Sequence, residues 1–105
     1  MKSPASVVVS MPTQIDMTNA DQVRDQLLAA LQSGAATVIV DLTETNYCDS
    51  TGCRSLTLAH RAGQVNGTEV RLAVVPGAAV ARSLTLLELD RLVHVYPSTE
   101  AAELG

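Results

Sequence analysis

The chain has 105 residues, and 47% of them are hydrophobic, so we predict a single folded domain over residues 1–105. Seven Lys and Arg against eleven Asp and Glu give a net charge of −4, which repels phosphate backbones and anionic membranes and argues against either as a partner. Phe and Trp are absent and only two Tyr are present, so the sequence offers little for base stacking and the core must be aliphatic.

Four short apolar segments are predicted to form strands. They are Val7–Val9, Val38–Leu42, Val70–Val75 and Val93–Tyr96, and each is followed by proline or lies before a helical pattern. The second segment is almost continuously apolar, which is typical of a strand buried on both faces.

Between these strands, apolar residues recur at the spacing of a helix. Val23, Leu27 and Leu31 predict a first helix, with Thr18 or Asn19 as its N-cap and Gly34 at its end. Further helices are predicted at about 51–64 and at about 78–87, the latter with Leu87 in register on its apolar side, and Ser98 opens a short terminal helix. Alternating strands and helices indicate an α/β fold with parallel pairing through right-handed crossovers.

No export signal or membrane span is evident in the sequence. Met1–Pro4 leads into an apolar run of only three valines, far short of the roughly 18 to 20 apolar residues of a membrane span. We therefore expect a cytoplasmic protein. Cys48 and Cys53 are too few for a disulfide framework or a zinc site, and His60 and His94 lie far apart, so we predict two reduced thiols and no cofactor or metal.

The segment most suited to carry chemistry joins the second strand to the second helix, over residues 46–55. In an open α/β sheet, such loops meet helix amides at the carboxyl edge of the strands. Ser50 or Thr51 lies where the helix leaves its first amides unpaired, and the simplest interpretation is an N-cap hydroxyl.

A series of short motifs carries a family resemblance. In chain order the motifs are Val38–Thr43, Asp49–Gly52, Ala59–Ala62, Val70–Val75, Leu89–Leu92 and Tyr96–Ala102. Their order and spacing resemble the STAS domain of bacterial anti-sigma factor antagonists, over nearly the whole chain from Ile15 onward. The resemblance implies a STAS-like fold, a small mixed and mostly parallel sheet of four to five strands with about four helices.

The resemblance also implies a function and a set of site residues. In that family the serine after the aspartate of the Asp-Ser-Ser/Thr-Gly motif is phosphorylated by an anti-sigma factor that is also a serine kinase, and Ser50 matches it. The unphosphorylated protein would capture the anti-sigma factor and free a sigma factor, in partner switching that regulates transcription under stress; a phosphatase would remove the phosphate. The expected partner-binding residues are Asp16, Asp49, Ser50, Thr51, Gly52, Arg54, Leu58 and Arg61.

Three positions depart from the family pattern. Thr13–Asp16 stands where the family usually has a Gly-Glu-Leu/Ile-Asp turn, Cys53 replaces a large aliphatic residue, and Glu88 replaces a frequent glycine near the end of the third helix. None of these departures removes Ser50.

Two alternatives stay open. Cys48 and Arg54 have the Cys-x5-Arg spacing followed by Ser55, which is similar to the phosphate loop of low-molecular-weight tyrosine phosphatases, with Cys48 as nucleophile and Arg54 clamping the phosphate. The second alternative is a STAS scaffold or ligand-sensing module without phosphorylation, since a fold does not fix a function. The main hypothesis is a non-enzymatic switch.

Overall fold

Four parallel strands form the main sheet of the computed structural model, which describes residues 3–105. In sheet order they are β1 (Ser3–Ser10), β3 (Ala35–Asp41), β5 (Glu69–Ala73) and β6 (His94–Tyr96). All four predicted strands are confirmed. Val38, Ile39 and Val40 are buried in succession, as expected for a strand that is covered on both faces.

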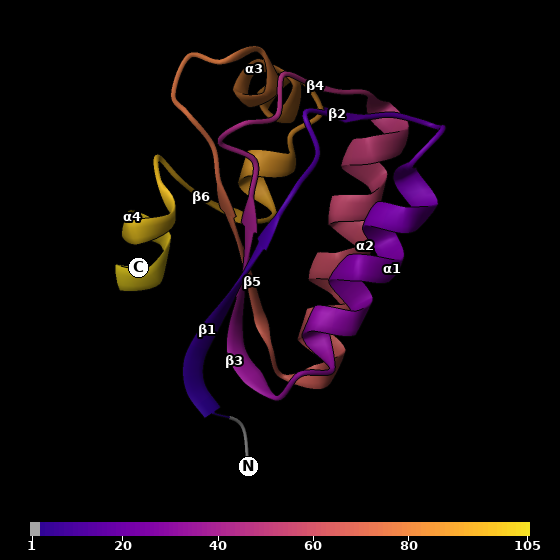
Figure 1. The fold of residues 1–105 in the computed structure, drawn as a ribbon. Coiled ribbons are helices and arrows are strands. Elements are labelled where there is room, and N and C mark those ends of the chain that lie inside the picture. The colour runs from indigo at the N-terminus through magenta and orange to yellow at the C-terminus, as the bar shows by residue number, and fades with distance from the viewer. Residues whose placement is uncertain (1–2) are drawn as a thin grey trace.

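The helices lie on both faces of this sheet and at one end of it. They are α1 (Ala20–Leu31), α2 (Ser50–Asn66), α3 (Ala79–Leu86), the short 3-10 helix η1 (Leu89–Arg91) and α4 (Thr99–Leu104). Figure 1 shows α1 and α2 side by side on one face, α4 on the opposite face, and α3 beyond the end of the strands. The predicted α/β fold with four helices and a mostly parallel sheet is confirmed.

The core is aliphatic, as the composition requires. The main cluster lies between the sheet and helices α1 and α2, where Leu27, Leu56 and Leu72 are fully buried. A smaller cluster on the other face packs Ile39 and Ala73 against Ala102 of α4. These two clusters bury the two faces of β3 and β5, and the carboxyl end of β3 leads into the segment before α2.

A second, two-stranded sheet was not predicted. β2 (Gln14–Ile15) and β4 (Tyr47–Cys48) pair in parallel, with Ile15 opposite Cys48. The segment after Pro12 therefore does not fold back on β1 as a hairpin. It runs beside the segment after β3 instead, and both lie beyond the carboxyl end of the main sheet (Figure 1).

Some predicted helix ends need correction. Asn19 precedes α1 but makes no cap to the helix amides, because its Oδ1 accepts from the amide of Asp16 while the Asp16 carbonyl accepts from Ala20. Leu87 lies just past the end of α3 and is 50% exposed, so it does not join the core. Ser98 does cap α4, since its hydroxyl accepts from the amide of Ala101 at 3.0 Å.

Glu88 lies in a turn whose backbone conformation favours the glycine that is frequent at this position in the STAS pattern. Its φ of 58° is in the left-handed region, and within residues 3–105 it is the only non-glycine residue with a positive φ. A side chain costs about 1–2 kcal/mol in this conformation, whereas glycine adopts it freely. The glycine that is frequent at this position in the family therefore suits the turn between α3 and η1.

Candidate functional site

The β2–β4 pair brings two distant segments to the start of α2. The amide of Asp49 donates to the carbonyl of Ile15 at 3.1 Å, which extends the pairing to the residue just before the helix. The amide of Asn46 donates to the carbonyl of Thr13 at 2.7 Å on the other side of the pair. The helix therefore begins at a position fixed by two strands.

Asp49 is the N-cap of α2. Its carboxylate accepts from the amide of Gly52 at 2.8 Å, and its carbonyl accepts from Cys53 at 2.9 Å. The prediction that Ser50 or Thr51 supplies the cap is therefore wrong. A carboxylate is the stronger acceptor and also complements the positive end of the helix dipole, so it takes this role one residue earlier.

The cap on Asp49 leaves Ser50 free. Ser50 is the first residue of α2, its side chain is exposed, and its hydroxyl has no hydrogen-bond partner within residues 3–105. The amides of Ser50 and Thr51 also have no acceptor in the described part of the chain. The site thus presents an accessible nucleophilic oxygen beside two open helix amides, which favour a negative group.

Gly52 is required by a close approach to β2. A Cβ at this position would lie 2.7 Å from Cγ2 of Ile15, 2.8 Å from Sγ of Cys48 and 3.0 Å from the carbonyl oxygen of Ile15. The glycine therefore lets the first turn of α2 rest directly on the β2–β4 pair.

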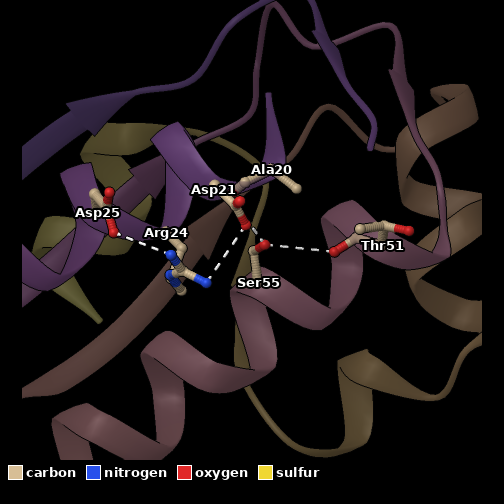
Figure 2. A network of polar contacts seen from close by, with 6 residues as sticks. All are labelled: Ala20, Asp21, Arg24, Asp25, Thr51 and Ser55. Carbon is tan, nitrogen blue, oxygen red and sulfur yellow. Dashed lines mark hydrogen bonds and ion pairs between the residues drawn. The ribbon is translucent and has the colours of Figure 1, made fainter. Parts of the chain in front are cut away.

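Ser55 ties the same turn to α1. Its buried hydroxyl lies 3.3 Å from the carbonyl of Ala20 and 3.4 Å from that of Thr51 (Figure 2). On the outer side of α1, Arg24 bridges Asp21 and Asp25 at 3.4 and 3.3 Å. The start of α2 is thus held by α1 on one side and by β2 on the other.

Two grooves flank Ser50. The first, of about 340 Å³, is lined by Ser50, Cys53, Arg54, Thr57, Leu58, Arg61, Leu87 and Leu89. The second, of about 330 Å³, is lined by Tyr47, Cys48, Asp49, Ser50, Ser83, Leu86 and Leu87. Ser50 and Leu87 belong to both grooves, so Ser50 stands on the ridge between them.

The first groove combines positive charge with apolar surface. Arg54 and Arg61 form no ion pair within the described residues, and Leu58 between them is 40% exposed. Arg54, Leu58 and Arg61 are all exposed and line this groove, so they share the outward side of α2. Leu87 also lines the first groove, and Leu86, which is 82% exposed, lines the second.

Leu86 and Leu87 were missed as site residues. The sequence does indicate exposed leucines here, because three leucines fall within residues 84–87 and one helix face cannot bury all of them.

Comparison with known proteins identifies the family. The model of the STAS domain matches residues 2–102, which is nearly the whole chain. The chain belongs to the STAS domain family. The similarity to the three solved structures below is one of fold, since their identities to this chain are under 25%.

Three solved structures illustrate the similarity. An anti-sigma factor antagonist from Mycobacterium paratuberculosis has 22% identity and a TM-score of 0.81, over 99% of this chain and 86% of that one. A sulfate transporter family protein from Wolinella succinogenes has 14% identity and a TM-score of 0.82, also over 99% and 86%. The anti-sigma factor antagonist SpoIIAA in its unphosphorylated form has 19% identity and a TM-score of 0.75, over 98% and 90%.

Two acidic residues that match the STAS pattern are engaged in turns. The carboxylate of Asp16 accepts from the amide and hydroxyl of Thr18, and these hydrogen bonds hold the pKa of Asp16 below its usual value. Asp41 likewise accepts from the amide and hydroxyl of Thr43, at 2.9 and 2.6 Å. Both carboxylates stabilise the backbone where a strand ends.

This STAS domain does not build the phosphate loop of a tyrosine phosphatase. Residues 50–54 form the first turn of α2, so the amide of Cys53 bonds within the helix and no backbone cradle surrounds Cys48. Cys48 is 2% exposed, and the hydrogen bond with Cys53, burial and the nearby Asp49 carboxylate raise the pKa of its thiol. Burial and the raised pKa therefore disfavour Cys48 as the nucleophile that attacks a phosphate ester from solution.

No group of three or more His, Cys, Asp or Glu side chains within residues 3–105 is placed to hold a metal ion. His60 is half-buried on α2 and His94 is exposed on β6, and neither lies beside Ser50. None of the helices in this part of the chain is both long and apolar enough to span a membrane.

Replacement of the N-cap tests the structure of the site. We expect Asp49→Ala to lower the free energy of unfolding by about 1 kcal/mol, because the amide of Gly52 loses its acceptor. Asp49→Asn should retain most of this stability, since an amide oxygen caps nearly as well. Urea unfolding of the three proteins measures the difference; equal losses in both variants would show that charge, not capping, is the contribution of Asp49.

Proposed function

We propose that this STAS domain is an anti-sigma factor antagonist that is switched by phosphorylation of Ser50. In its unphosphorylated form it binds an anti-sigma factor that is also a serine kinase, and thereby frees a sigma factor in the cytoplasm of a bacterium. The observation that carries the proposal is the Ser50 hydroxyl, which is exposed on a ridge between two grooves and has no hydrogen-bond partner within residues 3–105. Along one of these grooves lie two arginines that form no ion pair within the same residues.

The grooves suit a protein partner. Leu58, Leu86 and Leu87 offer exposed apolar contacts, and Arg54 and Arg61 offer two cations that are not neutralised within the described residues. An apolar centre with arginines is the composition that interface hot spots favour. A partner with carboxylates opposite these arginines would complement the site.

Phosphorylation would change this surface without unfolding it. The phosphate would lie at the positive end of α2, where the amides of Ser50 and Thr51 are open, and four residues before Arg54 on the same side of the helix. It would therefore pair with Arg54 and remove that cation from the partner, while adding about 1.5 to 2 negative charges to the ridge.

The proposed partner-binding residues fall into two groups. Ser50, Thr51, Arg54, Leu58 and Arg61 are exposed and would contact the partner directly. Asp49 and Gly52 would act by shaping the first turn of α2, and Asp16 by holding the turn that leads into α1. A phosphatase that restores the free Ser50 would complete the cycle.

The proposal is tested by locating the phosphate. The chain is incubated with ATP and candidate anti-sigma factor kinases, and the modified residue is assigned by fragmentation of the tryptic peptide 25–54. We expect phosphate on Ser50 only. Ser50→Ala should abolish the incorporation, and Thr51→Ala, which removes the neighbouring exposed hydroxyl, should leave it intact.

Other outcomes would identify other functions. If no kinase modifies Ser50 and the chain still binds a partner, the protein is a STAS scaffold, which its similarity in fold to a sulfate transporter family protein allows. Phosphate-ester hydrolysis that is lost in Cys48→Ser would instead establish the phosphatase alternative and contradict the proposal.

A further inference from the structure

The two cysteines of the chain meet beneath Ser50. Sγ of Cys48, at the end of β4, lies 3.6 Å from Sγ of Cys53, which is in α2. Gly52 makes this approach possible, since a Cβ at that residue would lie 2.8 Å from Sγ of Cys48. The sequence contains no other cysteine, so each thiol has one intramolecular partner.

Each thiol residue borders a different groove. Cys53 lines the groove of Arg54 and Arg61, and Cys48 lines the groove of Tyr47 and Leu86. Cys48 and Cys53 are only 2% and 3% exposed, so a bulky external thiol has poor access to their sulfur atoms. A small oxidant such as hydrogen peroxide can enter either groove and needs to reach only one sulfur.

The pair ionises unequally. The hydrogen bond between the two thiols lowers the pKa of Cys53 and raises the pKa of Cys48. Cys53 also lies in the first turns of α2, where the helix dipole favours a thiolate. Cys53 is therefore the thiol that reacts first, and Cys48 is the thiol that stays protonated beside it.

We propose that Cys48 and Cys53 form a peroxide-sensitive dithiol that closes an intramolecular disulfide beneath Ser50. The Cys53 thiolate attacks one oxygen of hydrogen peroxide and becomes a sulfenic acid, and the hydroxide that leaves takes up a proton. Cys48 then attacks the sulfur of Cys53, loses its proton and expels the second oxygen as water. Two thiols and one peroxide give one disulfide and two waters, and the peroxide is reduced.

The disulfide would close a ring over residues 48–53, which contains Ser50. It would tie the end of β4 covalently to α2 and restrain the first turn of that helix. The chemistry involves only this chain and an oxidant, so the inference goes beyond the proposed function and does not depend on a kinase or on an anti-sigma factor.

Cleavage between the two cysteines tests the disulfide. The reduced full chain is treated with hydrogen peroxide, remaining thiols are alkylated, and the denatured protein is cut on the amino side of aspartate. The cut before Asp49 separates residues 41–48 from residues 49–89. We expect one linked species that contains both fragments after peroxide, and two separate alkylated fragments without it. Cys48→Ala and Cys53→Ala should both give no linked species.

Two other results would overturn the inference. Separate fragments with sulfinic acid on Cys53 would show that Cys48 does not trap the sulfenic acid, and a dimer on a nonreducing gel would show that the thiols pair between chains. Hydrogen exchange gives a second readout, in which the amides of Gly52 and Cys53 should exchange at least about tenfold more slowly in the oxidised chain. Unchanged exchange would contradict the restraint on the helix.

Discussion

Phosphate on Ser50 should weaken binding of the anti-sigma factor by about 100-fold, or about 2.7 kcal/mol. The phosphate would place about 1.5 to 2 negative charges on the ridge between the two grooves, in a chain whose net charge is already −4. It would also occupy Arg54, which otherwise has no ion-pair partner within the described residues. Repulsion between the phosphate and the carboxylates of the proposed partner weakens binding, and so does the loss of this cation.

Calorimetric titration of the partner into matched proteins measures the effect. Ser50→Ala should bind as tightly as the unmodified chain, and Ser50→Asp should lose part of the affinity, since it carries one charge and fewer acceptors than a phosphate. Gln26→Glu is the control for added charge, because Gln26 is exposed on α1 and lines neither groove, and this variant should bind as tightly as the unmodified chain. Equal affinity of the phosphorylated and unphosphorylated chains would refute the switch.

Most of the fold could be predicted because its long elements follow simple periodicities. The nearly continuous apolar run of Val38–Leu42 reflects a strand that is buried on both faces, and the helical spacing of Val23, Leu27 and Leu31 reflects burial of one face of a helix. The location of the site followed from the same pattern. A loop after a central parallel strand must reach the carboxyl edge of the sheet, and Ser50 lies beyond that edge, at the start of α2.

The β2–β4 pair could not be predicted in this way. Each strand has two residues, which is too short to show a periodicity, and the partners lie more than thirty residues apart in the chain. Their pairing depends on backbone groups, since Asp49 donates to the carbonyl of Ile15. Backbone hydrogen bonds leave no direct trace in side-chain chemistry, so the sequence carries little information about them.

The choice of N-cap was mispredicted for a related reason. Asp49, Ser50 and Thr51 are all good N-cap residues, and local sequence does not say at which of them the helix begins. The pairing with Ile15 holds Asp49 in extended backbone, at φ −81° and ψ −177°, and so decides the register. A tertiary contact thereby frees the Ser50 hydroxyl that the proposed function requires.

We expect Gly52→Ala to lower the free energy of unfolding by about 2 kcal/mol. Alanine in a helix interior would ordinarily stabilise the protein by up to about 1 kcal/mol, but here the added Cβ overlaps Ile15 and Cys48. The overlap includes the carbonyl oxygen of Ile15 at 3.0 Å, which belongs to the β2–β4 pair and cannot rotate away as a side chain can. Urea unfolding measures the loss.

Gly63→Ala is the matched control in the same helix. Its added Cβ would lie 2.6 Å from the carbonyl oxygen of Thr68, so it should also destabilise the chain, but it lies far along α2 from Ser50. At a temperature where both variants are folded, only Gly52→Ala should slow phosphorylation of Ser50, because only this change displaces the first turn of α2. Equal rates in the two variants would show that the contact of Gly52 with β2 serves stability alone and does not position Ser50.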